Sequence, residues 1–169
     1  SRGLGDVYKR QAQLRADLDA FGEGRSFSLA TQIQIASAYN ALERPHEAAL
    51  ALEHLIQRHP ASEAVESVLA ELTGLWMRLE RWDKVIHATQ TFASAYPSSR
   101  HLPLMLYLRG CAQQKAEQLR EAHDTFAAVA KEHRNHEISA NARFMTAHTL
   151  LMESRPADAA LKPVSYTHL

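Results

Sequence analysis

The sequence has few of the residues that cross-link, interrupt or anchor a chain. Among its 169 residues are one cysteine, Cys111, six glycines and six prolines. A single cysteine excludes an internal disulfide framework and leaves the cellular compartment open. No apolar run approaches the roughly 18 residues that a membrane-spanning helix needs, so we expect no direct membrane insertion of this segment. Scarce glycine and proline beside a hydrophobic content of 46% are typical of a globular helical protein.

Neither sign of charge is in excess. The chain has 19 Lys and Arg residues against 19 Asp and Glu residues. Basic residues such as Arg78, Arg81 and Lys84 alternate with acidic ones, which is typical of a solvated surface. Without a basic stripe, we do not expect the chain to bind nucleic acid.

Motifs of the common enzyme classes are missing as well. The sequence contains no glycine-rich phosphate-binding loop, no HExxH and no GxSxG. His133 and His136 have a spacing that metal ligands can have, but we place them in a loop between helices. No cysteine and no distant acidic set completes such a site. We therefore expect no enzyme activity, no cofactor and no metal.

What the chain does contain is a repeated phrase. ERPHEAA begins at Glu43, ERWDKVI at Glu80, EQLREAH at Glu117 and SRPADAA at Ser154, each copy thirty-seven residues after the last. Self-similarity at such a period indicates an array of small, stacked helical units. In such an array, function lies mostly in a surface that the stacking creates.

Three columns of like residues appear when the copies are aligned at this spacing. Small or medium apolar residues occupy the first, larger apolar residues the second and small residues the third. The columns are Ala48, Val85, Ala122 and Ala159; Leu18, Leu55, Phe92 and Val129; and Ala36, Thr73, Gly110 and Ala147.

Each repeat is predicted to form two helices. Pro45 suits the first turn of a second helix, and a helix should end before Pro60 because the residue before proline avoids the α region. We expect no strand, since no window alternates with period two between turn signals. The helices should lie near 12–21, 27–42, 45–59, 62–79, 82–95, 100–116, 119–133 and 136–153, with a stub from 156.

Capping side chains are expected where the first helix of a repeat begins. Ser62 is the candidate in the second repeat, Ser98 or Ser99 in the third and Asn135 in the fourth.

The columns resemble the tetratricopeptide repeat, whose helix–turn–helix unit has small residues where its helices cross and a proline near its end. Ala36, Tyr39, Ala48, Leu55 and Pro60 stand at the family's offsets. The resemblance implies an all-α, right-handed α-solenoid of stacked antiparallel helix pairs. Arg109 and Gln113 depart from it, because the family has an apolar and an aromatic residue there.

We expect the repeat array to span residues 12–162. Its predicted parts are a partial repeat at 12–24, then repeats at about 27–60, 61–97 and 98–134, and a truncated one at 135–162. Residues 1–11 and 163–169 resemble translated sequencing-adapter DNA, which suggests non-native junction peptides on a metagenomic fragment. Pro163 supports a junction, since it falls at a mid-helix position where proline costs about 3 kcal/mol.

The length of the repeat suggests a narrower resemblance. Units longer than usual with a Tyr-Pro-Ser-Ser junction, here Tyr96 to Ser99, look like those of bacterial cell-envelope proteins. On this likeness the periplasm or cell envelope is favoured over the cytoplasm.

The family resemblance also implies a function. The first helices of its repeats line a concave wall that binds peptides, so we expect a non-catalytic scaffold for a protein or peptide partner. The positions that carry over to a partner-binding groove are Asn40, Met77, Arg78, Tyr107, Gln114, Phe144, His148 and Leu151. The family's carboxylate-holding positions carry Ile33, Ser37 and Leu104 here, so capture of a terminal carboxylate is not expected.

Three alternatives accompany this interpretation. The array could be the regulatory or substrate-recruiting arm of a larger enzyme. Cys111 and His148 could be neighbours, although a small buried thiol is the better interpretation of Cys111. Finally, uncapped apolar faces at Leu14 and Leu18 and at Phe144 and Leu150 favour concentration-dependent self-association.

Overall fold

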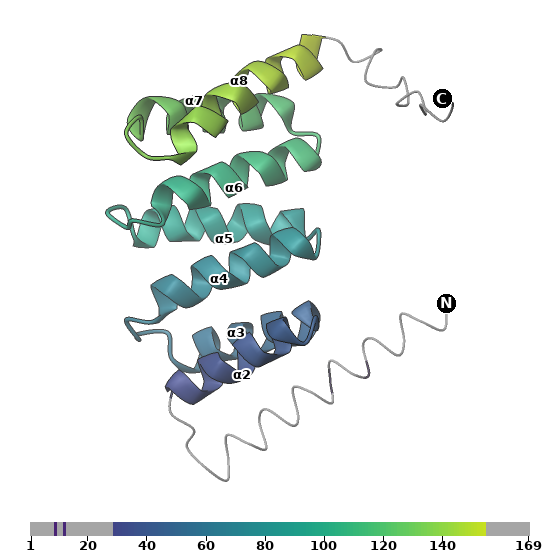
Figure 1. The fold of residues 1–169 in the computed structure, drawn as a ribbon, viewed down its shortest axis with the longest axis vertical. Helices are drawn as coiled ribbons and strands as arrows, with labels where there is room; N and C mark the ends of the chain where they lie inside the picture. The colour runs from purple at the N-terminus through teal and green to yellow at the C-terminus, as the bar shows by residue number, and fades with distance from the viewer. Residues whose placement is uncertain (1–8, 10–11, 13–28, 155–169) are drawn as a thin grey trace, which may run out of the picture. The chain divides into compact units, whose positions relative to one another are not determined.

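The computed structural model describes residues 9, 12 and 29–154, and these form seven α-helices and no strand (Figure 1). The predicted helix at 12–21 and the stub from 156 lie outside the described helices. The seven helices begin and end within three residues of the predicted bounds. They are α2 (Leu29–Ala41), α3 (Pro45–Arg58), α4 (Val65–Arg78), α5 (Trp82–Ala95), α6 (Leu102–Lys115), α7 (Leu119–Glu132) and α8 (Ile138–Ser154).

The chain divides into two compact units. We call residues 1–84 the N-terminal unit and residues 85–169 the C-terminal unit. The first contains α2, α3, α4 and the start of α5, and the second contains the rest of α5 with α6, α7 and α8.

The turn between the two helices of a repeat has the same backbone three times. Glu43, Glu80 and Glu117 adopt φ angles of 56°, 55° and 62°. In the first turn, the Glu43 amide donates to the Asn40 carbonyl over 3.1 Å and the Arg44 amide to the Tyr39 carbonyl over 2.9 Å, and the other two turns repeat this pair of bonds. This is the Schellman motif, in which a left-handed residue lets the last carbonyls of a helix find donors.

Glutamate is an unusual residue for that left-handed position, because its Cβ meets the following carbonyl there. Glycine has no such contact. We expect Glu80→Gly to raise the free energy of unfolding by about 1 kcal/mol, measured by denaturant unfolding. Glu80→Ala is the matched control, since it removes the carboxylate and keeps the Cβ. Equal effects of the two substitutions would contradict the explanation by backbone strain.

The junction between repeats also recurs, and it corrects the predicted helix caps. The Ala64 amide donates to Ser62 Oγ over 3.2 Å, and the His101 amide donates to Ser99 Oγ over 2.9 Å. At the equivalent place in the last junction, the Ile138 amide donates to His136 Nδ1 over 3.2 Å. Each acceptor lies in a turn before the helix rather than at its N-cap, and His136, not Asn135, has this role in the fourth repeat.

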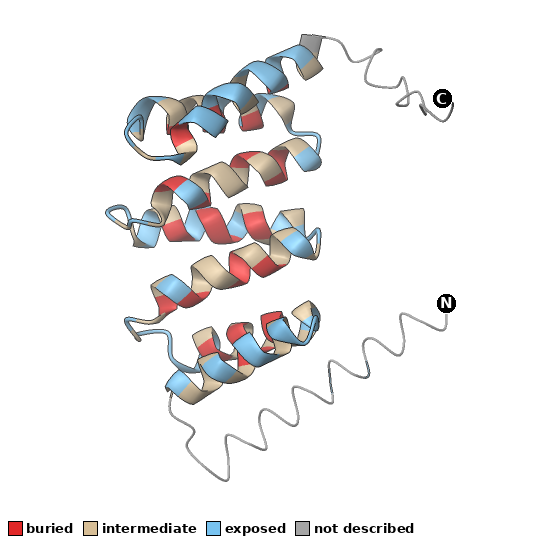
Figure 2. Cartoon of the chain, in the orientation of Figure 1, coloured by how far each residue is buried: buried red, intermediate tan, exposed pale blue. Residues whose placement is uncertain are grey.

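The core of the N-terminal unit fills the space between α2, α3 and α4. Buried residues on these helices form one cluster with half-buried apolar neighbours around it (Figure 2). Its fully buried members include Ala36, Ala48, Leu52, Leu55 and Leu72. At its edge, Lys84 Nζ lies 2.5 Å from Glu53 Oε1 and 5.2 Å from the centre of the Trp76 ring.

The core of the C-terminal unit is centred on a fully buried phenylalanine. Phe126 of α7 lies against Gly110 of α6, where an added Cβ would stand 2.6 Å from the Phe126 ring. The Tyr107 ring lies 5.4 Å from that of Phe126. Glycine is therefore required at residue 110 by the close approach of two helices.

In the first two columns, every position that the structure describes is buried. Ala48, Val85 and Ala122 are inaccessible to solvent, as are Leu55, Phe92 and Val129. Ala159 and Leu18 lie outside the described residues. In the third column Ala36, Thr73 and Gly110 are buried, whereas Ala147 is exposed on α8.

Threonines replace apolar residues at some buried positions without leaving a polar group unpaired. Thr73 Oγ1 donates to the Leu69 carbonyl over 2.7 Å, and Thr89 Oγ1 to the Val85 carbonyl over 2.8 Å. Thr149 Oγ1 donates likewise to the Met145 carbonyl over 2.9 Å. A hydroxyl bonded to the carbonyl one turn earlier satisfies the requirement for buried polar groups.

Candidate interaction surface

The eight predicted groove residues all lie on the first helices of repeats, divided between the two units. Asn40 on α2 and Met77 and Arg78 on α4 belong to the N-terminal unit. The C-terminal unit contains the rest of the set, Tyr107 and Gln114 on α6 and Phe144, His148 and Leu151 on α8.

In the N-terminal unit, two predicted residues meet at the ends of their helices. Arg78 Nη1 donates a 2.5 Å hydrogen bond to Asn40 Oδ1, across 38 residues of sequence. Arg78 is the last residue of α4, where the helix dipole favours a positive charge. Its side chain is exposed. The bond to Asn40 employs one of five guanidinium donors and orients the group for a further acceptor. Met77 beside it is half-buried.

In the C-terminal unit, three predicted residues form a chain of contacts between α6 and α8. Gln114 Nε2 lies 3.1 Å from His148 Nδ1 and donates also to Met152 Sδ over 3.0 Å. The His148 ring stacks on the Phe144 ring, with centroids 6.0 Å apart and planes at 20°. His148 therefore contacts Gln114 of α6 on one side and Phe144 of its own helix on the other. The exposed Phe144 ring is thereby held by a hydrogen-bonded histidine.

Tyr107 is separate from this chain of contacts and interacts with Cys111. Burial is the main reason why the pKa of the Cys111 thiol is raised, although a hydrogen bond from Tyr107 acts in the opposite direction. Burial and the neighbouring thiol likewise raise the pKa of Tyr107. A raised thiol pKa reduces the thiolate fraction at neutral pH, and the thiolate is the nucleophile. Cys111 is half-buried rather than fully buried as predicted, and its contacts disfavour a reactive thiolate.

The histidine pair that suggested a metal has a backbone role instead. His136 accepts the Ile138 amide at the start of α8, and the His136 amide donates to the His133 carbonyl over 2.9 Å. Within residues 29–154, no group of three or more His, Cys, Asp or Glu side chains is arranged to hold a metal ion. Among the described helices, none is both long and apolar enough to cross a membrane.

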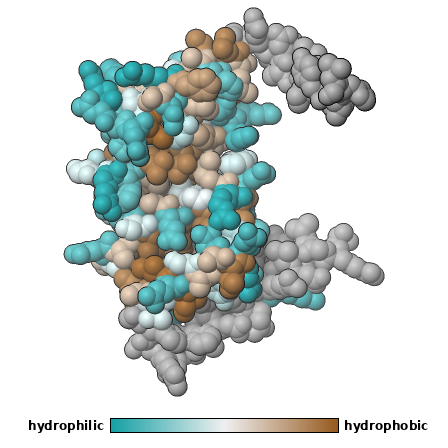
Figure 3. Space-filling view, in the orientation of Figure 1, coloured by the Kyte–Doolittle hydropathy of each residue, from teal (hydrophilic) through white to brown (hydrophobic). Residues whose placement is uncertain are grey.

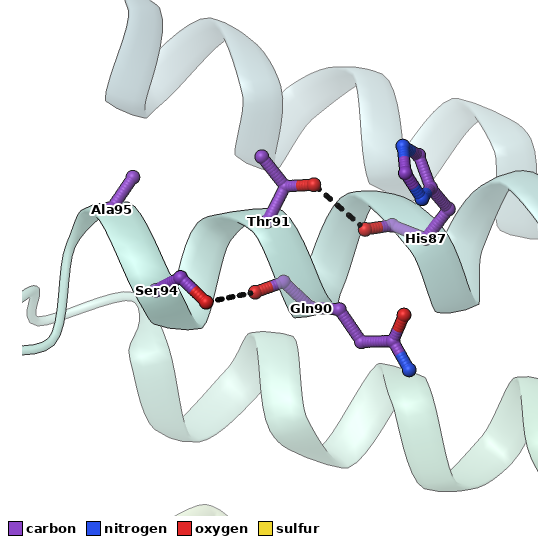
Figure 4. A pocket seen from close by; sticks show the side chains of 5 residues that line it. All are labelled: His87, Gln90, Thr91, Ser94 and Ala95. Atoms are coloured by element: carbon purple, nitrogen blue, oxygen red, sulfur yellow. Dashed lines mark hydrogen bonds between the residues drawn. The ribbon is translucent and has the colours of Figure 1, made fainter.

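A shallow, open depression lies along α5 (Figure 4). Its lining residues are His87, Gln90, Thr91, Ser94 and Ala95. Thr91 Oγ1 donates to the His87 carbonyl and Ser94 Oγ to the Gln90 carbonyl, both over 3.1 Å. Because both hydroxyls are bonded to the helix backbone, the other polar side chains of this surface are those of His87 and Gln90.

Leu150 was absent from the predicted groove set, although it is 54% exposed on α8 beside Leu151. Its equivalent in α6 is the buried Gln113, so the repeat register predicts a packed position rather than a surface one.

Comparisons with known proteins agree with this architecture. Residues 31–62 match the model of the tetratricopeptide repeat. The chain is similar to the crystal structure of nearly identical TPR-like repeats of a putative kinesin light chain from Podospora anserina, with a TM-score of 0.65 and 16% identity over 92% of this chain and 82% of that one. A crystal structure of a single-substitution variant of that protein gives a TM-score of 0.66 at the same identity and coverage. No curated protein matches the chain. The likeness confirms the predicted all-α solenoid fold.

Proposed function

We propose that this chain, whose residues 31–62 match the tetratricopeptide repeat and whose fold is similar to that of TPR-like repeats, is a non-catalytic scaffold that binds a polypeptide partner on the first helices of its repeats. Repeat arrays present extended surfaces made of many similar helices, and such surfaces suit extended or helical polypeptides. The predicted contact residues are on those helices in both units.

The observation that carries the proposal is the hydrogen bond between the half-buried Asn40 and the exposed Arg78. Fixing a long, flexible side chain by a 2.5 Å hydrogen bond reduces the entropy that it loses when a ligand binds. No acidic side chain is bound to Arg78 in the described part of the chain. A guanidinium presented in this way matches a carboxylate, which can accept two parallel hydrogen bonds from it.

We therefore infer that the partner contributes an Asp or Glu side chain to Arg78 and an apolar residue to Met77. A side-chain carboxylate fits better than a terminal one, because Ile33, Ser37 and Leu104 occupy the positions with which the family holds chain ends. In the C-terminal unit, the proposed contact residues are Tyr107, Gln114, Phe144, His148 and Leu151.

A phage-displayed library of random peptides, selected on the purified chain, tests the proposal. We expect enrichment of peptides with an acidic residue beside an apolar one. In fluorescence anisotropy, Arg78→Ala should weaken the binding of a selected peptide about ten- to hundredfold, since a hydrogen bond to a charged group contributes about 1.5–3 kcal/mol.

Arg81→Ala is the matched control. Arg81 is also exposed, but its Nε lies 3.7 Å from Asp83 Oδ1, and it is not among the predicted groove residues. Its substitution should leave the affinity unchanged. Selection of no peptide, or equal losses from the two arginine variants, would refute the proposal.

The bacterial-envelope setting and the alternative of a recruiting arm of a larger enzyme stay predictions of the sequence. In both cases the chain binds a polypeptide, so the Arg78→Ala experiment tests polypeptide binding whichever of the two is right.

A further inference from the structure

The outer face of α8 carries an apolar seam with the spacing of a coiled coil. Ala140, Phe144, Ala147 and Leu151 follow one another at intervals of four, three and four residues, and all four are exposed. Figure 2 shows α8 mostly in the colour of exposed residues. Phe144 is 68% exposed and Leu151 61%. Intervals of three and four place side chains on one narrow stripe of a helix, which is the stripe that a second helix covers in a coiled coil. Figure 3 shows hydrophobic side chains gathered where α8 ends.

The anchor of this seam is held in its exposed position. Phe144 stacks on His148, and His148 Nδ1 shares a hydrogen bond with Gln114 Nε2 of α6. An exposed aromatic ring without such support loses rotamer freedom when it is buried in an interface. Since Phe144 is already restrained by His148, it loses less conformational entropy when a partner binds. Fixed aromatic anchors are the residues that contribute most to binding energy.

The order of sizes along the seam identifies the occupant. Read forward, the seam is small, large, small, large; read backward, it is large, small, large, small. An antiparallel copy of α8 therefore places Phe144 of one copy against Ala147 of the other, and Leu151 against Ala140. A parallel copy would place Phe144 against Phe144 and leave the alanines facing each other. Self-complementarity under a two-fold rotation is the property that a symmetric dimer interface requires.

We propose that α8 docks antiparallel on α8 of a second copy of this chain, through the Ala140–Phe144–Ala147–Leu151 seam. Four side chains from each copy bury less than the about 1,200 Å² at which stable interfaces begin, so the dimer is weak and forms at micromolar concentrations or above. The inference does not depend on polypeptide binding at Arg78, because the dimer is measured with the protein alone.

Sedimentation velocity of the full chain over concentrations from about 1 to 500 µM tests the proposal, since this range spans the dissociation expected of so small an interface. The sedimentation coefficient should rise from the monomer value to the dimer value. Phe144→Ala and Ala147→Phe should each weaken the dimer about tenfold or more, the first by removing the anchor and the second by opposing two phenylalanines. Leu42→Ala is the matched control, because Leu42 is 68% exposed in the N-terminal unit and is not part of the seam.

The decisive measurement mixes the two seam variants. Phe144→Ala has small residues at both central positions, and Ala147→Phe has large residues at both. The antiparallel register makes these two chains complementary, so an equimolar mixture should dimerise at concentrations at which each variant alone stays monomeric. Native mass spectrometry distinguishes the heterodimer by its mass. Circular dichroism confirms that each variant folds.

Three results would overturn the proposal. A monomer at every concentration would mean that other residues, of this chain or of another protein, cover the seam. Association that persists in both single variants would place the interface elsewhere. A mixture that stays monomeric would exclude the antiparallel register.

Discussion

Replacing Gly110 with alanine is expected to lower the free energy of unfolding by about 1 kcal/mol, and by no more than about 2 kcal/mol. The new Cβ would lie 2.6, 2.8 and 2.9 Å from three carbon atoms of the Phe126 ring. That ring is fully buried and has Tyr107 on one side, so it cannot move without disturbing its neighbours. Overpacking of this kind typically costs about 1–3 kcal/mol, from which about 1 kcal/mol is regained because alanine is the better helix former.

Gly74 supplies a matched control for this prediction. It also lies inside a helix, α4, but a Cβ added there meets no atom within 4 Å. We expect Gly74→Ala to raise the free energy of unfolding by about 1 kcal/mol through helix propensity alone. Urea unfolding followed by circular dichroism measures both variants. Effects of the same sign would show that the ring of Phe126 yields, contrary to our expectation.

Replacing Arg109 with leucine is expected to stabilise the protein by about 1–2 kcal/mol, an unusual result for a single substitution. Arg109 Nε is buried and has no hydrogen-bond partner in the described structure, and Arg109 Nη2 lies 3.5 Å from Thr125 Oγ1, at the limit for a hydrogen bond. A buried donor without a partner costs about 1–3 kcal/mol. Leucine removes this cost, and Thr125 keeps its 2.8 Å bond to Gln113.

Gln113→Leu is the comparison variant for Arg109→Leu. Gln113 is buried and accepts the Thr125 hydroxyl, so its loss should destabilise the protein by about 1 kcal/mol. Thermal unfolding of the two variants should therefore move the midpoint in opposite directions. A destabilised Arg109→Leu would mean that the guanidinium is a necessary member of this polar group.

The helices and their buried positions could be predicted because they depend on local sequence and on the repeat. Pro45 starts α3 at the predicted residue, and α5 has its predicted bounds. The described residues in the columns of Ala48 and Leu55 are buried because the two helices of each repeat pack through the same positions. Ala147 departs from its column, because it is exposed on α8 whereas Ala36, Thr73 and Gly110 are buried.

The turns and the contacts between predicted site residues were harder to predict. A histidine nitrogen takes the place of a serine hydroxyl at residue 136, and capping preferences, which are drawn from hydroxyl and amide side chains, do not include that substitution. The sequence placed Asn40 and Arg78 on equivalent faces, but their hydrogen bond depends on how two helices lie against each other. The same is true of Gln114 and His148.

The turns at Glu43, Glu80 and Glu117 and the junctions at Ser62, Ser99 and His136 repeat their backbone at one constant interval. Suppose that a duplication inserts, or a deletion removes, one whole repeat of thirty-seven residues. Each residue at the new join is then followed by a segment with the same backbone conformation as before. A change of any other length would bring a helical residue to a left-handed turn or to a junction. The array is therefore suited to lengthen and shorten in evolution by steps of thirty-seven residues, with its turns unchanged.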